Sequence, residues 1–503
     1  MSSSQNQKSP LKILFVGAEV APFAAVGGLS QVLSYLPKAL LAKGLDVRVI
    51  LPKYGLIDEK KYKIQMALSG LKVPTIPGDN GRFLICNMKT TQLRKTDPIT
   101  YFVENMEYYE KRSNVYGYDD DHIRFALLSR ATIEFLRKSS WVPNIIHAND
   151  WHTGYLINDL HAAYGDEKLK SIATLLTVHN LYQGRFDFRQ ASVIDFDDGK
   201  GPLPDFFDAN FQKKNPLKRG VIYADAVNTV SENHAAEITT ELFGEGLHNL
   251  FREIRVKLFG ILNGIDHTSW NPETDTLIAA NFSARTPGKR AENKTDLQKI
   301  FHLDQNLTIP LLGFVGRLHT QKGIELLRTV LPRVLAEGHA QFVMVGTGDR
   351  GYREFFEKLE SQFPGQVGTH LMVNFTIPRK IYAGADMMLI PSKWEPGGIV
   401  AMEAMRYGSV PVAHATGGLA DIVNDYNPVD RSGTGFTFSH FDETSFLLAL
   451  TRAMETYRRP DEWKDLLIRC LRQDYSWNHA AEEYLKLYRH TLALHENAAD
   501  GNG

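Results

Sequence analysis

Cysteine, net charge and long apolar runs are scarce in this 503-residue sequence. The two cysteines, Cys86 and Cys470, lie far apart without CxxC or Cys/His spacing, which argues against a disulfide framework and against a zinc site. We expect them to be incidental thiols in a reducing compartment. Lysine and arginine (57) balance aspartate and glutamate (58), giving a net charge of −1. The charge therefore offers no argument for binding nucleic acid or an anionic membrane.

We expect neither a membrane span nor an export segment. No apolar run approaches the roughly 18 residues of a membrane span. The start, MSSSQNQKSP, lacks the apolar core of a secretory signal and the Arg-rich pattern of a transit peptide. We therefore expect a cytoplasmic protein with a disordered start at residues 1–10. The length is too great for one ordinary core and predicts two or three domains.

The first half of the chain predicts a parallel sheet covered by helices. A strand-like run from Leu11 precedes a helix-like segment from Leu29 to Lys43 and a second strand-like run at 46–54. Strand, helix and strand in this order are typical of a βαβ unit. Similar apolar runs that end in polar residues recur as NIIHAND, SIATLLTVHN and DAVNTVSE.

The second half repeats this pattern. Its strand-like runs are IPLLGFVGRL, AQFVMVGTGD, GTHLMVNF, DMMLIPSKW and SVPVAHATGG, with helix-like stretches between them. We therefore expect an α/β protein with two doubly wound, Rossmann-like domains facing each other across a deep cleft. The predicted parts are a first domain at 11–265, a linker at 266–280, a second domain at 281–475, a C-terminal helix at 476–496 and a disordered tail at 497–503.

Two glycine-rich or basic loops are candidates for binding a phosphate. Gly27 and Gly28 follow a predicted strand and open a predicted helix, so their N–H groups could receive a phosphate; a plain turn is the alternative. Arg317 and Lys322, in GRLHTQKG, also follow a predicted strand. Two cations at this spacing could neutralise a diphosphate, and a solvated basic loop is the alternative.

The stretch PSKWEPGGIVAMEAMRYG carries a more specific pattern. Glu395 and Glu403 flank seven residues, with a Pro-Gly-Gly turn where a helix should start. A carboxylate beside free amides can accept hydrogen bonds from sugar hydroxyls, although Glu403 could equally be a surface helix residue. The amides expected to face a ligand are those of Gly397, Gly398 and Ile399, and Gly417 and Gly418 repeat the pattern.

Polar side chains follow neighbouring predicted strands in the first half. Asp150 and His152 lie in HANDWHTG, and His179 lies in TVHNLYQGRF. A single histidine at a strand end is more often structural than catalytic. Three polar groups at successive strand ends of one sheet indicate a site.

These motifs together resemble the bacterial glycogen synthase and plant starch synthase family, retaining glucosyltransferases of the two-domain GT-B architecture. The likeness covers nearly the whole chain and implies that the C-terminal helix packs back toward the first domain. The matching stretches are EVAPFAAVGGLSQVLSYLPKAL, YGYDDDHIRFALLSRA, DWHTG, TVHNLYQGRF, YADAVNTVSENHAAEI, LNGIDHTSWNPETD, GRLHTQKG, EPGG, TGGLADIV and GTGFTF.

The resemblance implies transfer of glucose from a nucleotide-glucose, usually ADP-glucose in bacteria, to the non-reducing 4-hydroxyl of an α-1,4-glucan. The expected partners are this donor and a glycogen or malto-oligosaccharide acceptor, without nucleic acid or membrane. The resemblance also implies no metal and no cofactor, because protein cations and amides stabilise the leaving diphosphate.

The resemblance further implies a role for each matching residue. Arg317 and Lys322 would bind the diphosphate, and Glu395 would hold the hydroxyls of the donor glucose. The carbonyl of His179 would favour positive charge at the anomeric centre. Of the other matching residues, Asn180 and Asn263 would contact the donor, and Asp150 and His152 would lie on the acceptor side.

The sequence departs from the family pattern at several positions. Ala25 and Gln31 stand where the family commonly has lysine and aspartate, and Gly397 replaces its usual cysteine. Glu403 completes a Glu-x7-Glu pattern of a neighbouring family, in which the second glutamate commonly contacts the ribose. Val373 falls near a position that is often aromatic. Two alternatives therefore remain open: a retaining GT-B enzyme using UDP- or GDP-glucose or a small acceptor, and a catalytically silent glucan-binding homologue.

Overall fold

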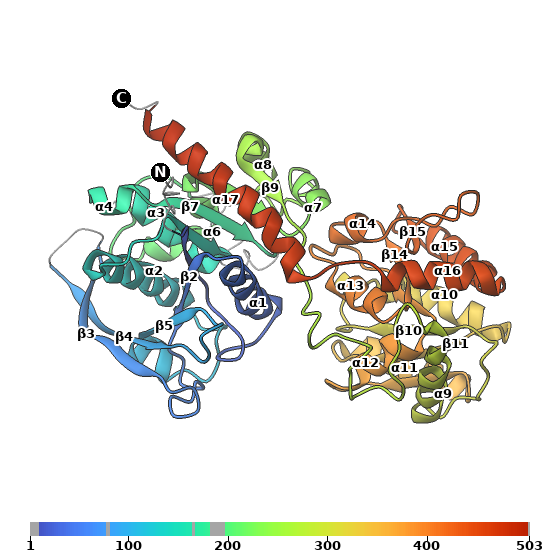
Figure 1. Ribbon diagram of the computed structural model, residues 1–503. Coiled ribbons are helices and arrows are strands. Elements are labelled where there is room, and N and C mark those ends of the chain that lie inside the picture. The colour runs from blue at the N-terminus through green and yellow to red at the C-terminus, as the bar shows by residue number, and fades with distance from the viewer. Residues whose placement is uncertain (1–9, 77–80, 163–165, 182–196, 501–503) are drawn as a thin grey trace, which may run out of the picture. The chain divides into compact units, whose positions relative to one another are not determined.

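The computed structural model describes residues 10–76, 81–162, 166–181 and 197–500. These residues form two compact α/β units (Figure 1). The first comprises the chain up to Val230, residues 235–264 and the chain from Trp477 onward, and the second comprises residues 231–234 and 265–476. The expected disordered start, apart from Pro10, and the last three residues of the expected tail lie outside the described residues.

The first unit is built on a nine-stranded sheet with the order β3-β4-β5-β2-β1-β6-β7-β8-β9. Neighbours from β5 to β9 are parallel, whereas β4 pairs antiparallel with β3 and β5. Every residue of β6 and β7 is buried, so helices or loops must cover both faces. The strands are β1 (Lys12–Val16), β2 (Asp46–Pro52), β3 (Gln65–Pro74), β4 (Phe83–Thr91), β5 (Ile99–Glu104), β6 (Ile145–Asn149), β7 (Ala173–Val178), β8 (Ala226–Thr229) and β9 (Leu258–Gly260).

Helices connect these strands. Local sequence explains several of their starts: α6, for example, begins at Pro216, and the Asn215 side chain accepts a hydrogen bond from the Lys218 N–H. The helices described before residue 265 and after residue 476 are α1 (Gly28–Ala42), α2 (Asp121–Lys138), α3 (Gly154–Ala162), α4 (Glu167–Lys170), α6 (Pro216–Tyr223), α7 (Glu232–Glu237), α8 (His248–Glu253) and α17 (Trp477–Asp500). Shorter helical turns are η1 (Met106–Glu110), η2 (Trp151–Thr153), η4 (Phe211–Lys213) and η5 (Arg255–Lys257).

The second unit has a six-stranded, fully parallel sheet with the order β12-β11-β10-β13-β14-β15. Its strands are β10 (Leu311–Val315), β11 (Gln341–Val345), β12 (Val367–His370), β13 (Met387–Ile390), β14 (Val410–His414) and β15 (Phe436–Phe438). Its helices and short helical turns are η6 (Pro287–Lys289), α9 (Arg290–Ile300), η7 (Thr320–Lys322), α10 (Ile324–Ala336), α11 (Arg350–Gln362), α12 (Ile377–Gly384), α13 (Ile399–Arg406), α14 (Gly418–Ile422), α15 (Glu443–Tyr457) and α16 (Pro460–Leu471). The predicted α/β class is confirmed in both units.

Three segments differ from expectation. Residues 266–280, the expected linker, pack within the second unit, where buried Asp275 accepts hydrogen bonds from Arg379 and Tyr407. The strand expected through Phe375 ends at His370, which leaves the side chains of residues 372, 373 and 375 exposed. Helix α17 continues four residues into the expected tail because alanines favour a helix and no glycine interrupts the segment Trp477–Asp500.

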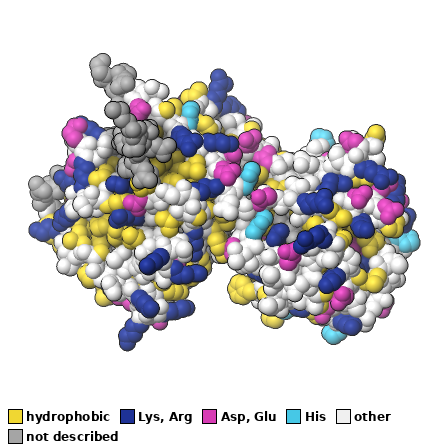
Figure 2. All heavy atoms as spheres, viewed as in Figure 1, with side chains coloured by type: hydrophobic (Ala, Val, Ile, Leu, Met, Phe, Trp, Pro, Cys, Tyr) yellow, Lys and Arg dark blue, Asp and Glu magenta, His cyan; other side chains and the backbone are white. Residues whose placement is uncertain are grey.

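The surface agrees with the balanced composition. On the face drawn in Figure 2, basic and acidic side chains are interspersed over both units. Among the described residues, no helix is both long enough and apolar enough to cross a membrane.

Helix α17 is the last element of the chain, yet it packs on the first unit, as expected. The Tyr488 hydroxyl forms a hydrogen bond of 2.9 Å with buried His147 of β6. Near the end of the helix, the His495 ring lies between two acceptors, Asp225 Oδ1 at 3.1 Å and the Lys170 carbonyl at 2.9 Å. Both ring nitrogens can donate only when the imidazole is protonated. The bond with Asp225 raises the pKa of His495.

This geometry makes the docking of α17 dependent on pH. Because the folded pKa of His495 is raised, its stabilisation is complete below about pH 6.5 and is lost as the pH rises through the folded value. We predict that His495→Gln lowers the free energy of unfolding of the first unit by about 1 kcal/mol at pH 6 and by much less at pH 9. Urea unfolding followed by circular dichroism measures both values.

The matched control is His479→Gln, which changes an exposed histidine on the same helix. This variant should unfold like the unmodified protein at both pH values. An equal loss for His495→Gln at pH 6 and pH 9 would contradict the role of the charged imidazole.

Candidate active site

The strand order reverses once beside a central strand in each sheet. In the first sheet the chain moves outward from β1 to β2 and later resumes on the other side of β1 with β6. In the second sheet it moves from β10 to β11 and later resumes with β13. Ligands of open parallel sheets bind beyond the carboxyl ends of the strands at such points. The segments that follow β1, β6, β10 and β13 contain most of the predicted site residues.

Lys322 and Glu395 form an ion pair at the reversal point of the second unit. Lys322 is the last residue of the turn after β10, and Glu395 lies in the loop after β13. Glu395 Oε2 accepts hydrogen bonds from Lys322 Nζ and from the Ser392 hydroxyl, the latter at 3.0 Å. The two side chains are 19% and 12% exposed, so both can reach a ligand from solvent.

Arg317 belongs to the same cluster. Its side chain is exposed and donates a hydrogen bond of 3.3 Å to Gln321, the residue before Lys322. The structure thus brings together both predicted cations and the predicted sugar-binding carboxylate.

The start of α13 presents backbone donors beside Glu395. Gly398 precedes the helix with a φ of +61°, a conformation that favours glycine. Within the described part of the chain, no hydrogen bond outside the regular helices takes the N–H of residues 397, 398 or 399. Free amides at a helix start favour an anion or an oxygen-rich ligand.

Gly418 differs from the expectation that its amide faces a ligand. The Gly418 N–H donates within the protein, to the carbonyls of Glu395 (2.9 Å) and Pro396 (3.0 Å). A Cβ on Gly417 would lie 2.3 Å from the Glu395 carbonyl oxygen. The pair therefore supports the backbone of the loop that carries Glu395.

Glu403 lies on α13 and is half-buried. Its Oε2 accepts a hydrogen bond of 3.0 Å from the Tyr382 hydroxyl, and burial raises its pKa to about 7. A purely exposed helix residue would have neither property.

Asp150 is the central residue of the first-unit group. It follows β6 with a φ of +57°, which is uncommon outside glycine, and it is 1% exposed. Its carboxylate accepts hydrogen bonds from the backbone N–H of His179, at 2.7 Å, and of Asn180. Among the described residues Oδ2 has no hydrogen-bond partner. Burial raises the pKa of Asp150 to about 7.

His179 and His152 are neutral at physiological pH because burial lowers both pKa values, that of His179 to about 3. The Asn149 amide nitrogen donates to two carbonyls, so its oxygen must accept from His179 Nε2 at 3.0 Å, which fixes the tautomer. The His152 ring lies tilted against the rings of Tyr116 and Trp151, at centroid distances of 5.0 and 4.1 Å.

Asn263 follows β9 and is 6% exposed. Its Oδ1 is buried without a hydrogen-bond partner in the described part of the chain. An unpartnered buried acceptor is costly, so this atom is a candidate to receive a ligand donor.

Glu19 takes the place expected for a phosphate at Gly27. Its Oε2 accepts the N–H groups of Val26 (2.5 Å) and Gly27 (3.0 Å). A ligand at Gly27 would have to displace this carboxylate. Gly28 remains open, since a Cβ there would meet no atom within 4 Å.

Two further residues, Tyr116 and Arg124, support the polar groups of the first unit. Neither was predicted from the sequence. Tyr116 shares a hydrogen bond with Glu19. Fully buried Arg124 donates to the carbonyls of Tyr108 and Val115, and so fixes the segment that carries Tyr116. Both residues lie in the stretch YGYDDDHIRFALLSRA, whose resemblance to the family is the signal for them.

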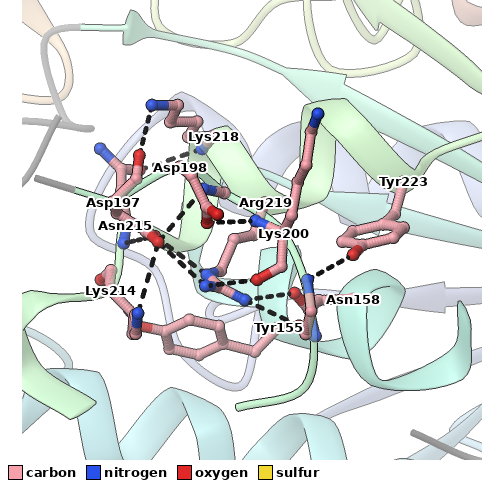
Figure 3. Close-up of polar contacts among 12 residues, drawn as sticks. Tyr155, Asn158, Asp197, Asp198, Lys200, Lys214, Asn215, Lys218, Arg219 and Tyr223 are labelled. Atoms are coloured by element: carbon pink, nitrogen blue, oxygen red, sulfur yellow. Dashed lines mark hydrogen bonds and ion pairs between the residues drawn. The ribbon is translucent and has the colours of Figure 1, made fainter. Parts of the chain in front are cut away.

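A buried ionic network anchors α3, the helix that follows His152, to α6 (Figure 3). Asp197 accepts hydrogen bonds from Arg219 and from the Asn215 N–H, and these hold its pKa below the ordinary value although burial opposes the shift. Arg219 also donates to Asn158 of α3 at 2.8 Å. The two helices approach so closely that a Cβ on Gly154 would lie 1.8 Å from the Pro216 carbonyl oxygen.

Three carboxylates of the first unit, those of Glu59, Glu104 and Glu110, lie within 4.8 Å of one another. Lys53 and Lys89 form ion pairs with them. These two cations compensate most of the negative charge of the three carboxylates.

Two family models match the chain. The starch synthase catalytic domain matches residues 12–253, and the model of glycosyl transferases group 1 matches residues 297–465. The matched ranges contain the candidate residues of both units except Asn263.

Relatives match over almost the full length. Glycogen synthases from Desulforamulus reducens and Clostridium novyi are 38% and 39% identical over 96% of this chain and 99% of their own. The solved catalytic domain of starch synthase IV from Arabidopsis thaliana, bound to ADP and acarbose, has a TM-score of 0.81 and 32% identity, covering 96% of this chain and 100% of its own. Sucrose-phosphate synthase from Thermosynechococcus elongatus, at 18% identity and a TM-score of 0.57, shares the fold. The chain belongs to the glycogen and starch synthase family of GT-B glycosyltransferases.

Proposed function

We propose that the protein is a glycogen synthase that transfers glucose from ADP-glucose to the non-reducing 4-hydroxyl of an α-1,4-glucan, with retention at the anomeric carbon. The relatives named glycogen synthase and the starch synthase solved with ADP and acarbose support this assignment. The observation that carries it is the pairing of Lys322 with Glu395 beside the free amides of α13.

The second unit would bind the donor. Lys322 and Arg317 neutralise the diphosphate as it leaves, which is the largest electrostatic requirement of the reaction. Glu395 and the amides of residues 397–399 hold the hydroxyls of glucose, and Glu403 contacts the ribose. Phe375, whose side chain is 87% exposed beyond β12, supplies an aromatic face for the base.

The first unit would bind the acceptor and the reacting carbon. Neutral His179 cannot act as a general acid, so its contribution is the dipole of its carbonyl beside the anomeric centre. The amide of Asn180 and the free oxygen of Asn263 contact the donor. Asp150 and His152 bind the acceptor glucan.

A second candidate function has support from the loop before α1, and it differs in the identity of the donor nucleotide or of the acceptor. Ala25 and Gln31 are exposed at the start of α1, and Glu19 already occupies the amide of Gly27. This loop offers the donor no side-chain cation. A retaining glucosyltransferase specific for UDP- or GDP-glucose, or for a small acceptor, fits the same geometry.

The assay that tests both candidates incubates the purified protein with ADP-, UDP- or GDP-glucose and with glycogen, maltose or a sugar phosphate. ADP release with lengthening of glycogen chains is expected. Transfer only from another donor, or only to a small acceptor, favours the second candidate, and no transfer from any donor contradicts both.

Glu395 and Lys322 give the sharpest mutational prediction. Glu395→Ala should abolish turnover, and Lys322→Ala should lower kcat by about 10²- to 10³-fold, because each removes a preorganised contact to the reacting donor. Initial rates of ADP release measure the loss. Glu337→Ala, which changes an exposed glutamate after α10, is the control and should keep full activity. Unchanged turnover in Glu395→Ala would remove Glu395 from the site.

Asp150 gives a prediction with opposite effects on stability and activity. Because its folded pKa of about 7 exceeds the unfolded value, ionisation destabilises the fold progressively from about pH 4 to pH 7. Asp150→Asn keeps an oxygen for the His179 amide but carries no charge. Relative to the unmodified protein it should gain stability as the pH rises, by at most about 4 kcal/mol, while losing glucan transfer.

Melting temperatures of both proteins at pH 5 and pH 8 test the first part of this prediction, and transfer rates at pH 8 test the second. A variant with full activity would show that Asp150 is structural. A stability difference that is the same at both pH values would show that the carboxyl group is not ionised between them.

A further inference from the structure

A pocket of about 1000 Å³ lies in the second unit, away from the proposed donor site. Pro310 in its wall directly precedes β10, and His339 lies just before β11. The pocket therefore opens where these strands begin, whereas Arg317 and Lys322 lie where β10 ends. The five residues of β10 separate the two places by about 17 Å.

The wall of the pocket is aromatic and apolar. Pro460, Trp463 and Leu467 line it from one face of α16, and Tyr457 lines it from the end of α15. These two helices are neighbours (Figure 1). The Tyr457 and Trp463 rings meet edge to face at 5.2 Å. Partly exposed Leu307 adds apolar surface. Rigid rings of this kind bind the flat face of a ligand.

Hydrogen bonds of its hydroxyl group hold the Tyr457 ring in place. Its hydroxyl donates to the Leu307 carbonyl at 3.1 Å and accepts from Lys294 Nζ at 3.0 Å. Lys294 is itself fixed by an ion pair of 2.7 Å with Asp386. A preformed aromatic wall reduces the entropy lost when a ligand binds.

The charged side chains that line the pocket are all basic. Its lining includes Arg285, Arg458 and Lys464, together with His339, and no aspartate, glutamate, asparagine or glutamine. Arg458 pairs with Glu455 at 2.9 Å. Within the described part of the chain, no ion pair involves Arg285 or Lys464. The pocket thus has uncompensated positive charge.

This lining separates ligand classes. A neutral sugar needs acceptors as well as donors for its hydroxyls, and the lining lacks the carboxylate and amide side chains that supply them. A phosphate needs cationic donors, which arginine and lysine provide. An aromatic base needs a ring or an apolar face, which Trp463 and Tyr457 provide.

We propose that this pocket is a second ligand site that binds a nucleoside monophosphate, with the base against Trp463 and Tyr457 and the phosphate between Arg285 and Lys464. The proposal does not depend on the proposed reaction, because it concerns binding at a place separate from Lys322 and Glu395.

The test is photolabelling of the full chain with 8-azidoadenosine 5′-monophosphate, followed by mapping of the labelled peptides. Peptide mapping separates this pocket from the proposed donor site, because Lys322 and Glu395 lie on other peptides. Label is expected on peptides that contain residues 285–288 or 454–467. It should be displaced by adenosine 5′-monophosphate at least tenfold more effectively than by adenosine or by inorganic phosphate.

A double variant, Arg285→Ser with Lys464→Ser, tests the phosphate contact. Both side chains are exposed, so the fold should be kept. Labelling should need about tenfold or more additional probe, whereas Lys358→Ser, at an exposed lysine of α11 outside the pocket, should label normally. Label confined to other peptides, equal labelling of the double variant, or equal competition by adenosine would overturn the proposal.

Discussion

Close backbone contacts that only glycine permits hold the proposed donor site in shape. A Cβ on Gly323 would lie 1.8 Å from the Pro391 carbonyl oxygen, and a Cβ on Gly417 would lie 2.3 Å from that of Glu395. These contacts press the loop after β10 and the start of α14 against the loop after β13. Lys322 and Glu395 meet because the absence of a Cβ at these glycines lets their loops approach closely. A rigid loop pair of this kind suits a site that must present charge without rearranging.

Burial sets the protonation of the polar groups in the first unit. It raises the pKa of Glu19 and Asp150 and lowers that of His179 and His152, so each group is moved toward its neutral form. Hydrogen bonds from backbone amides oppose this shift at both carboxylates. The group therefore provides hydrogen bonds and dipoles in preference to full charges, whereas the two predicted phosphate-binding cations, Arg317 and Lys322, lie in the second unit.

Much of this arrangement could be read from the sequence. Apolar runs ending in polar residues predicted most of the parallel strands, although not β5, β9 or β15. They also placed Asp150, His179 and Lys322 at the carboxyl ends of strands, because strand direction alone fixes that edge. Strands β3 and β4 were not predicted, because many of their residues are exposed and buried and exposed residues alternate irregularly along them. The hydrogen bond from the Gly27 N–H to Glu19 could not be predicted, because it depends on how the loop between these two residues folds back. The pocket beside Trp463 gathers five separate segments, which no local pattern reports.

The position of α17 has a consequence for how the protein is made. The second unit is inserted into the first, and the chain enters and leaves it through paired residues, since the Ile265 N–H donates to the Tyr475 carbonyl at 2.7 Å. A ribosome must synthesise the whole second unit before the last helix of the first unit emerges. Until then the buried faces of β6 and β8 that receive Tyr488 and Tyr484 are uncovered. The first unit therefore cannot complete its fold until its last helix, α17, has been synthesised.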